Sequence, residues 1–508
     1  MKLKYIGISM LALMMAACGS NSDYRNAIPS RSAAVVSFDM TSMAEKSGLS
    51  GNNANTNLQN RLKSMAKSGI SGADGLIDRI FEDVSESGLG LKDKVYFFSG
   101  EQAKTAGAVI KVEDEGKLDE LLEMLAGQGV CDKVKDKDGC KWTVVGNILL
   151  AYKSHAMLLV ADNKGGDPSS LVRQASMWLR QEGGEGFSST SDFKLMDSKS
   201  SDIVAWNTLE VFPTDMIYPI VMGISAELNL KNVKAVSSID FENGKIEMDV
   251  ETVISDKIVS GIMDRKDKVM SSVEGGYLDM FPSNTPFWAA ANIKGGEFFD
   301  FICSNPSVKR YFDKSMLPLD FASIFDAVEG DVVLAMSGTN SREFIAYADI
   351  RSKDFMNSFE SLKSMAAMSG GQVYLNNHGE NGYEFKTYDG SIVGLKSGPM
   401  ALWFGVKGDK LYLTNKESLI DRRVLGLTLK NKDWGKKVAG QKFFMASDLT
   451  SLDKIVELKS SGKAMSALLG VLGGLDFFTV ESSDGKNLLI EVVMKDRNRN
   501  PLSVVLNQ

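Results

Sequence analysis

The stretch IPSRSAAVVSFD, residues 28–39, has a related stretch, FPSNTPFWAAAN, at residues 281–292, and this repetition indicates how the chain is organised. Four further matches follow in the same order: LIDRIFEDV (76–84) with DFASIFDAV (320–328), VYFFSG (95–100) with VLAMSG (333–338), VIKVEDEGKLDELLEML (109–125) with ADIRSKDFMNSFESLK (348–363), and IDFENGKIEMDV (239–250) with TVESSDGKNLLIEVV (479–493). The offset between partners stays between 238 and 253 residues throughout. Matches in one order at a near-constant offset predict two homologous halves.

Each half follows one plan of strands and helices. An apolar strand at 33–39 precedes amphipathic helices at 58–69 and 75–88, then short strands and a helix at 117–127. Three consecutive strands are expected within 141–162, and a helix at 168–183 that begins with proline. Strands joined mostly by hairpins predict an α+β fold, in which each repeat is a mostly antiparallel sheet with helices packed on it.

The amino end resembles a bacterial lipoprotein signal. Lys2 and Lys4 precede an apolar run of about eleven residues, which is too short to span a membrane, where ~20 are needed. Small residues then lead directly to Cys18 in the sequence MAAC, which is similar to a lipobox. The resemblance implies cleavage before Cys18 and lipidation of that cysteine, which would attach the protein to the membrane. Gly19 follows where Asp would mark retention at the inner membrane, so the outer membrane is expected, facing the periplasm or the cell surface.

The expected organisation follows from these two features. The sequence predicts five segments: a signal peptide at 1–17, a tether at 18–27, repeat domain one at 28–256, a linker helix at 257–276 and repeat domain two at 277–508. A chain of 508 residues exceeds one hydrophobic core, which agrees with a division into domains.

The charge balance excludes one class of partner. The net charge is −7, and removal of residues 1–17, which hold two lysines and no acidic residue, takes it to −9. An acidic protein repels a phosphate backbone, so nucleic acid is not expected as a partner. No later segment has the ~18 uncharged apolar residues of a membrane span, so only the lipid at Cys18 is expected to contact the membrane.

The lipobox, the spacer GSNSDYRNA and the segment IPSRSAAVVSFDMTSMAEKSGL together resemble a family of uncharacterised cell-envelope lipoproteins of Bacteroidetes, known as a domain of unknown function. The match is carried by Ile28-Pro29, by Val35-Val36-Ser37 and by MAEKSGL at 43–49, and it extends over nearly the whole mature chain. The resemblance implies a place in the cell envelope and lends no activity.

Three cysteines remain after Cys18. Cys131 and Cys140 bracket DKVKDKDG, whose Asp-Gly pair is a turn signal, and an exported protein sits where disulfides persist. The spacing predicts a disulfide between Cys131 and Cys140, with a pair of free thiols as the alternative. Cys303 has no partner in sequence and is expected to be a buried thiol.

Motifs for catalysis or metal binding are missing from the sequence. The two histidines, His155 and His378, do not correspond under the repeat offset, and no zinc-protease, nucleophile-elbow or phosphate-loop motif occurs. DKVKDKDG fails as a calcium loop, because valines fall at its first and last ligand positions. The acidic cluster EDEGKLDE (113–120) fits a helix start. No catalytic residue, metal ligand or cofactor is therefore assigned.

Exposed aromatic and methionine side chains are the remaining lead. Tryptophans lie in both halves: Trp142, Trp178, Trp206, Trp288, Trp403 and Trp434. They are candidate binding platforms, with burial in the core as the alternative, and Met365 and Met368 are candidates for an adaptable surface.

The sequence is compatible with three functions. The first is a non-enzymatic envelope lipoprotein that acts as a binding or scaffolding module for a protein, glycan or apolar ligand. The second is a glycan hydrolase acting through paired carboxylates, and the third is a carrier of an apolar ligand. The sequence favours a protein that is not an enzyme.

Overall fold

The computed structural model describes residues 23–506, apart from 53, 70–73, 101–104, 138, 163–167, 213–229, 255–260, 262–263, 266–267, 314–318, 338–342, 391–396 and 451–472. The chain divides into two compact units. The first comprises residues 1–214, 230–253 and 496–508, and the second comprises residues 215–229 and 254–495. The last residues, 496–508, thus belong to the first unit, although the sequence placed them in the second half.

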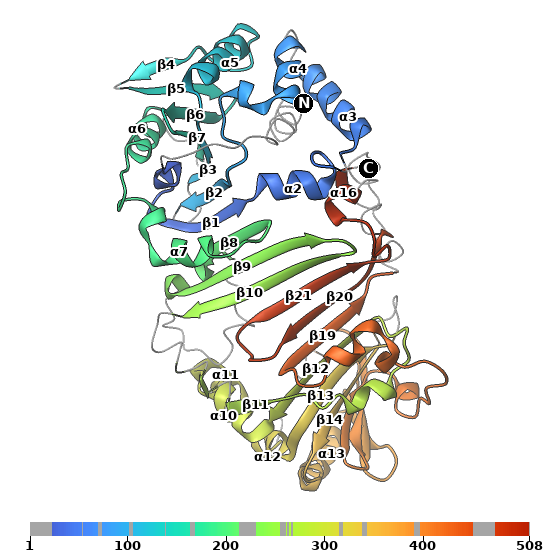
Figure 1. Cartoon of the computed structure of the whole chain (residues 1–508). Coiled ribbons are helices and arrows are strands. Elements are labelled where there is room, and N and C mark those ends of the chain that lie inside the picture. Colours follow the sequence, from blue (N-terminus) through green and yellow to red (C-terminus); the bar gives the residue numbers. More distant parts are fainter. Residues whose placement is uncertain are drawn as a thin grey trace. The chain divides into compact units, whose positions relative to one another are not determined.

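The first unit is built on ten antiparallel strands (Figure 1). They are β1 (Ser32–Phe38), β2 (Val95–Gly100), β3 (Thr105–Lys111), β4 (Lys135–Lys137), β5 (Cys140–Val145), β6 (Ile148–Lys153), β7 (Ala156–Asp162), β8 (Ile203–Thr208), β9 (Val233–Glu242) and β10 (Lys245–Ile254). Their order across the sheet is β10-β9-β8-β1-β2-β3-β7-β6-β5-β4. The predicted strand near residue 33 is therefore central, with β2 on one side and β8 on the other.

Helices fill the connections between these strands. They are α2 (Met40–Ser47), α3 (Thr56–Gly69), α4 (Asp74–Glu82), α5 (Glu115–Gly127), α6 (Pro168–Leu179), α7 (Ser191–Asp197) and α16 (Pro501–Leu506), with 3-10 turns η1 (Tyr24–Ala27), η2 (Val84–Ser87), η4 (Phe187–Ser189), η5 (Leu209–Val211) and η6 (Leu230–Asn232). Local signals fix their ends. Asp39 caps α2 by accepting from the Ser42 amide, and Gly48 ends it in the left-handed region with φ of 79°.

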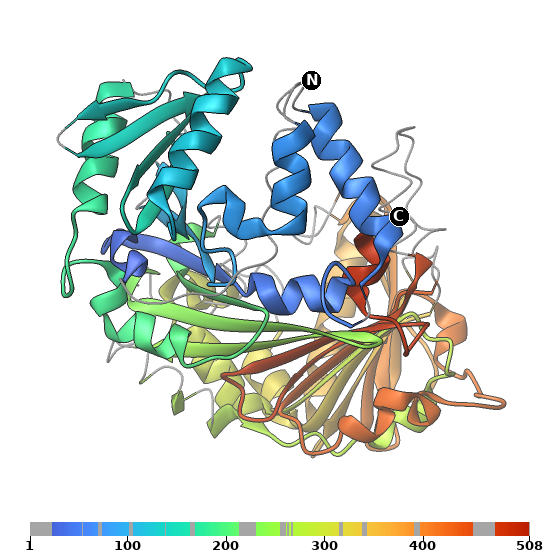
Figure 2. The same ribbon diagram turned by 45° about the horizontal axis from the view of Figure 1, so that its top comes forward.

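Two helices cover opposite faces of the strands β5–β7 (Figure 2). Leu150, Tyr152 and Met157 point toward α5 in one core, whereas Leu149, Ala151 and Leu158 share a second core with α6. This division follows from the alternation of side chains along a strand. Both faces of this part of the sheet are therefore buried.

The second unit contains eleven strands among its described residues: β11 (Met270–Ser271), β12 (Phe287–Lys294), β13 (Val328–Met336), β14 (Phe344–Ile350), β15 (Val373–Asn377), β16 (Gly382–Thr387), β17 (Met400–Lys407), β18 (Lys410–Thr414), β19 (Phe443–Asp448), β20 (Leu475–Ser482) and β21 (Leu488–Met494). Ten of them pair in the order β21-β20-β19-β12-β13-β14-β18-β17-β16-β15, all antiparallel. When the ten strands of each unit are counted in the order of the chain, the pairing order is the same in both units.

The helices of the second unit are α10 (Gly295–Cys303), α11 (Pro306–Asp313), α12 (Phe321–Ala327) and α13 (Ser358–Met368), with 3-10 turns η7 (Gly276–Met280), η8 (Asp354–Asn357), η10 (Glu417–Leu419), η11 (Leu429–Asn431) and η12 (Asp433–Lys437). One core gathers Trp288, Trp434 and Phe444, and another packs α13 against β15–β17 through Phe359 and Tyr383. The structure confirms an α+β fold with antiparallel sheet, and eleven α-helices occur in the described parts of the chain.

Residues 257–260, 262–263 and 266–267 of the predicted linker helix at 257–276 lie outside the described residues, and the expected end of this helix is wrong. The chain leaves the helical conformation after Val269, and Met270–Ser271 form β11, which pairs with Ile293 and Asn292 of β12. This pairing satisfies backbone groups of β12 beyond the last residue that pairs with β19, Ala291. The strand therefore replaces the last helical turns.

Asp202 connects α2 to the sheet of the first unit. Its side chain is only 1% exposed. It accepts hydrogen bonds from the Ser42 hydroxyl (2.5 Å), the Lys46 ammonium (2.8 Å) and the Phe241 amide (2.7 Å). Removal of this carboxylate would take one acceptor from all three donors at once, so we expect the stability of the first unit to depend on it.

We expect Asp202→Ala to destabilise the first unit by about 3 kcal/mol, because it leaves the Ser42 hydroxyl and the Phe241 amide without this acceptor, while Lys46 keeps only its longer contact with Glu242 (3.3 Å). Urea unfolding followed by circular dichroism measures the change. Asp74→Ala, which removes an exposed acid at the start of α4, is the matched control and should cost less than about 1 kcal/mol. Equal stability of the two variants would contradict the role given to Asp202.

Candidate functional site

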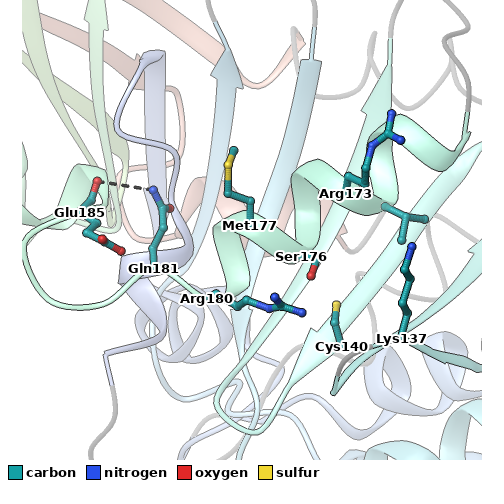
Figure 3. A pocket seen from close by; sticks show the side chains of 9 residues that line it. Lys137, Cys140, Arg173, Ser176, Met177, Arg180, Gln181 and Glu185 are labelled. Carbon is teal, nitrogen blue, oxygen red and sulfur yellow. Dashed lines mark hydrogen bonds between the residues drawn. The ribbon is translucent and has the colours of Figure 1, made fainter.

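A cavity of about 860 Å³ lies in the first unit between α6 and the β4–β5 hairpin (Figure 3). Pro168 opens α6, where the missing amide hydrogen costs no helical bond. Leu171, Val172, Ala175, Trp178 and Leu179 of this helix are buried in the core. The next stripe of the helix, Arg173, Ser176 and Met177, borders the cavity, since residues three and four apart share a face. Arg180, which directly follows the last residue of α6, borders it as well.

The hairpin supplies the opposite wall. Lys137 and Cys140 are paired residues at the turn of β4 and β5, so both reach the cavity from its sheet side. Gly139 forms this turn with φ of 72°, a conformation that favours glycine. Gln181 and Glu185 close the end of the cavity beyond α6, where the Gln181 amide donates to the Glu185 carbonyl oxygen (3.5 Å).

Positive charge dominates this site. Three cations border it, Lys137, Arg173 and Arg180, against one acid, Glu185. Among the described residues, neither Lys137 nor Arg173 forms an ion pair. Figure 3 shows the Arg180 guanidinium directed toward Ser176 and Cys140, and the Lys137 ammonium on the side of Arg173. Cations that converge on a partly enclosed space attract an anion, and arginine binds carboxylate or phosphate through two parallel hydrogen bonds.

Burial affects the acidity of the Cys140 thiol. Cys140 is 2% exposed, and burial raises its pKa above the usual range of a thiol. Ser176 and Arg180 oppose this rise without cancelling it. A raised pKa keeps the sulfur protonated at neutral pH, and the reactive form of a cysteine is the thiolate.

The predicted disulfide between Cys131 and Cys140 is wrong, since both cysteines are free. Cys140 pairs with Lys137 at the hairpin turn, whereas the amide next to Cys131, that of Asp132, donates to the Val144 carbonyl (3.0 Å). The two cysteines thus lie about five residues apart along one hairpin, on the order of 15 Å. A disulfide needs Cα atoms within about 7 Å.

The other predicted site residues lie apart from this cavity. Cys18 is outside the described residues. His155 occupies the β6–β7 turn, where its carbonyl accepts from the Val112 amide (3.0 Å) and burial lowers its pKa. His378 follows β15 in the other unit, 3.9 Å from the Glu417 carboxylate. Cys303 ends α10 as a partly buried free thiol.

Most tryptophans serve the cores. Trp178, Trp206, Trp288 and Trp434 are buried, while Trp142 and Trp403 are half-buried beneath lysines, with Lys135 4.7 Å from the Trp142 ring centre. Met365 and Met368 are exposed on α13, 40% and 77% respectively.

The acidic cluster 113–120 is structural. Asp114 caps α5, and Asp119 accepts from the Tyr152 hydroxyl (2.5 Å) and the Lys141 ammonium (2.6 Å). Over the described residues, no group of three His, Cys, Asp or Glu side chains is placed to hold a metal ion. In the same part of the chain, no helix has the length and apolar character needed to cross a membrane.

Sequence reasoning missed the cationic cavity. Arg173 and Arg180 are seven residues apart in RQASMWLR, which is two helical turns, so one helix face carries both. That spacing was available as a signal. The approach of Lys137 was not, because it depends on the hairpin folding onto α6.

The chain is an α+β protein of two units, with a cavity bordered by cations in the first. The chain belongs to the family described as Domain of unknown function (DUF4836), whose family model matches residues 24–502. No curated protein matches the chain.

Three solved structures, crystal forms IV, III and I of TP0453, are distantly similar, each with a TM-score of 0.27. Their sequence identities are 10%, 9% and 10%. The matches cover 46%, 50% and 50% of this chain, and 81%, 90% and 88% of those chains. This degree of likeness is too low to support an argument about fold or function.

The thiols give a direct test of the corrected assignment. In denaturant without reductant, we expect Cys131, Cys140 and Cys303 each to react with iodoacetamide, as read by peptide mass spectrometry. In the native protein, Cys131 and Cys140 should react slowly at pH 7 and faster as pH rises, because burial raises both pKa values. A disulfide-linked peptide pair joining Cys131 to Cys140 would contradict the structure.

Proposed function

We propose that this chain is a lipid-anchored protein of the cell envelope that binds an anionic ligand and catalyses no reaction. The observation that carries the proposal is the cavity between α6 and the β4–β5 hairpin, where Lys137 and Arg173 have no acidic partner among the described residues. A cavity of about 860 Å³ is of the size that holds a small molecule or a few sugar units.

The ligand carries a carboxylate, sulfate or phosphate group. Two or three such groups match the cations at Lys137, Arg173 and Arg180, while Ser176 and Gln181 offer neutral hydrogen bonds. The exposed side chain of Met177, 61% accessible, adds an apolar contact for the body of the ligand. An acidic sugar and a sugar phosphate share this chemistry.

The alternative of a carboxylate-dependent glycan hydrolase has less support. Hydrolysis of a glycoside needs two carboxyl groups facing one another across the bond. The cavity has one acid, Glu185, whose carboxylate accepts from the Glu182 amide (3.0 Å).

We also propose that the two units arose by tandem duplication. The ten strands of each unit pair in one order, and the related stretches at 28–39 and 281–292 both lead into the central strand, β1 or β12. The placement in the outer membrane, with a lipid on Cys18, rests on the leader sequence and on its resemblance to lipoproteins of Bacteroidetes.

Isothermal titration of the 19–508 chain tests the anion site. The probes are oligogalacturonate, glucose 6-phosphate and inorganic phosphate, with a neutral cello-oligosaccharide for comparison. We expect at least one anionic probe to bind in the cavity and to weaken as salt rises. Lys137→Ala/Arg173→Ala should weaken that binding at least tenfold, since each lost charged hydrogen bond contributes roughly 1.5 kcal/mol or more.

Lys92→Ala/Lys194→Ala is the matched control, because both lysines are exposed in the first unit and form no ion pair among the described residues. Its affinity should stay within twofold of the unaltered protein. The proposal would be overturned if the Lys137/Arg173 variant bound the anionic probe as tightly as the unaltered protein does. It would also be overturned if neutral and anionic sugars bound equally well.

Cys18→Ala tests the anchor separately. Without the thiol no acyl chain can be added, so the variant should lose the mass of the lipid and leave the membrane fraction. Mass spectrometry of the amino-terminal peptide and cell fractionation measure both effects. A Cys18→Ala protein that stays membrane-bound would contradict lipid anchoring at this residue.

A further inference from the structure

The two units differ in what covers one face of the sheet. In the first unit, α6 lies over Leu149, Ala151 and Leu158. At the end of this helix, the Trp178 ring meets the Phe98 ring edge to face, with centroids 5.4 Å apart. This face is therefore sealed by a helix and by large aromatic side chains.

The strand registers identify the equivalent place in the second unit. Val35 and Trp288 occupy the same position in the related stretches 28–39 and 281–292. Phe98 of β2 pairs with Val35, and Ala335 of β13 pairs with Trp288, so Phe98 and Ala335 are equivalent. A small side chain thus replaces a large one. Residues 415–442, which the structure describes throughout, join β18 to β19 through the 3-10 turns η10, η11 and η12, where the first unit has α6.

A cavity of about 610 Å³ lies at this place. Apolar and aromatic side chains line it, among them Phe281, Ala335, Ile345, Tyr347 and Leu419. Protein interiors are packed closely, so an open volume of this size beside apolar side chains is typical of a ligand site.

The charges at the rim are unbalanced. Three acids border the cavity and each has a cation: Asp279 pairs with Lys430, Asp409 with Lys410, and Asp421 with Lys407. Arg422 and Arg423, also at the rim, form no ion pair with any described residue. Two guanidinium groups therefore remain available to an anion.

Tyr347 adds a donor inside the cavity. Its hydroxyl has no hydrogen-bond partner among the described residues, and its ring is held by Tyr277 (5.8 Å, stacked) and Phe281 (6.1 Å). Burial raises the pKa of Tyr347 to about 12, so the hydroxyl stays protonated and can donate to an anionic oxygen at neutral pH.

We propose that this cavity of the second unit binds an organic carboxylate with an apolar body. The apolar body lies against Ala335, Ile345 and the Tyr347 ring, and the carboxylate meets Arg422, Arg423 and the Tyr347 hydroxyl. This site is separate from the anion site beside α6 and does not depend on it. A fatty acid and an aryl-substituted carboxylic acid share the chemistry.

Titration calorimetry of the 19–508 chain tests the proposal with decanoate and 4-phenylbutyrate, and with decanol as the uncharged comparison. We expect one molecule of carboxylate per chain, bound more tightly than decanol. Tighter binding of decanoate would indicate that the apolar body of the ligand is an alkyl chain, and tighter binding of 4-phenylbutyrate would indicate an aromatic ring. A chain that binds neither carboxylate, or binds decanol as well as decanoate, would overturn the proposal.

Two variants locate the site. Arg422→Gln/Arg423→Gln should weaken carboxylate binding at least tenfold and leave decanol unaffected, and these exposed side chains are not needed for folding. Ala335→Phe, which places in β13 the residue of the first unit, should abolish binding of both. If Ala335→Phe does not fold, Ala335→Leu takes its place, and circular dichroism of each variant decides which is used.

The matched control is Lys309→Gln/Arg310→Gln on α11, which removes two exposed cations that form no ion pair among the described residues. It should bind within twofold of the unaltered protein. Lys137→Ala/Arg173→Ala should also bind decanoate normally, which separates this site from the first unit. Loss of decanoate binding in either control variant would overturn the assignment of the site to this cavity. Unchanged decanoate binding in the Arg422/Arg423 variant would overturn it as well.

Discussion

The covering of both faces of an antiparallel sheet is the constraint on which the rest of this structure depends. Side chains alternate along each strand, so strands in the interior of a sheet present apolar residues on both sides and need two covers. In the first unit these covers are α5 and α6, which bury Leu150 and Leu149 respectively. Burial of each large apolar side chain stabilises the unit by roughly 1.5–3 kcal/mol.

The candidate sites follow from how this constraint is met. Because the buried stripe of α6 is occupied by the core, its neighbouring stripe with Arg173 and Arg180 is directed at the edge of the sheet, where Lys137 approaches. In the second unit the same face is covered by 3-10 turns and a smaller side chain, Ala335, and a cavity results. Similar pairing of strands is thus combined with two differently lined cavities.

Much of the fold was predictable from local patterns. The pairs Gly146-Asn147 and Asn243-Gly244 are sequence signals for hairpin turns, and both glycines have positive φ. The central place of β1 was not predictable, since it depends on pairing with β8, about 170 residues later. The predicted disulfide between Cys131 and Cys140 is wrong because two cysteines close in sequence stay apart when the chain between them runs along a hairpin.

The sites were less predictable than the fold. The sequence match aligned Phe97 with Ala335, but the strand registers equate Phe98 with Ala335, and a shift of one residue exchanges the two faces of a strand. Which face is open, and which cations reach it, therefore required the structure. Tyr347 and Arg422 carry no sequence signal, because each is a common residue that acquires its role from its neighbours.

The most decisive experiment is a crystal structure of the 19–508 chain at a resolution that places side chains. We expect the same pairing order for the ten strands of 32–254 and the ten of 287–494, with α6 over the first sheet and only solvent or a small molecule beside Tyr347 in the second. A different pairing order in the second unit, or polypeptide of the same chain filling the space beside Tyr347, would contradict this expectation.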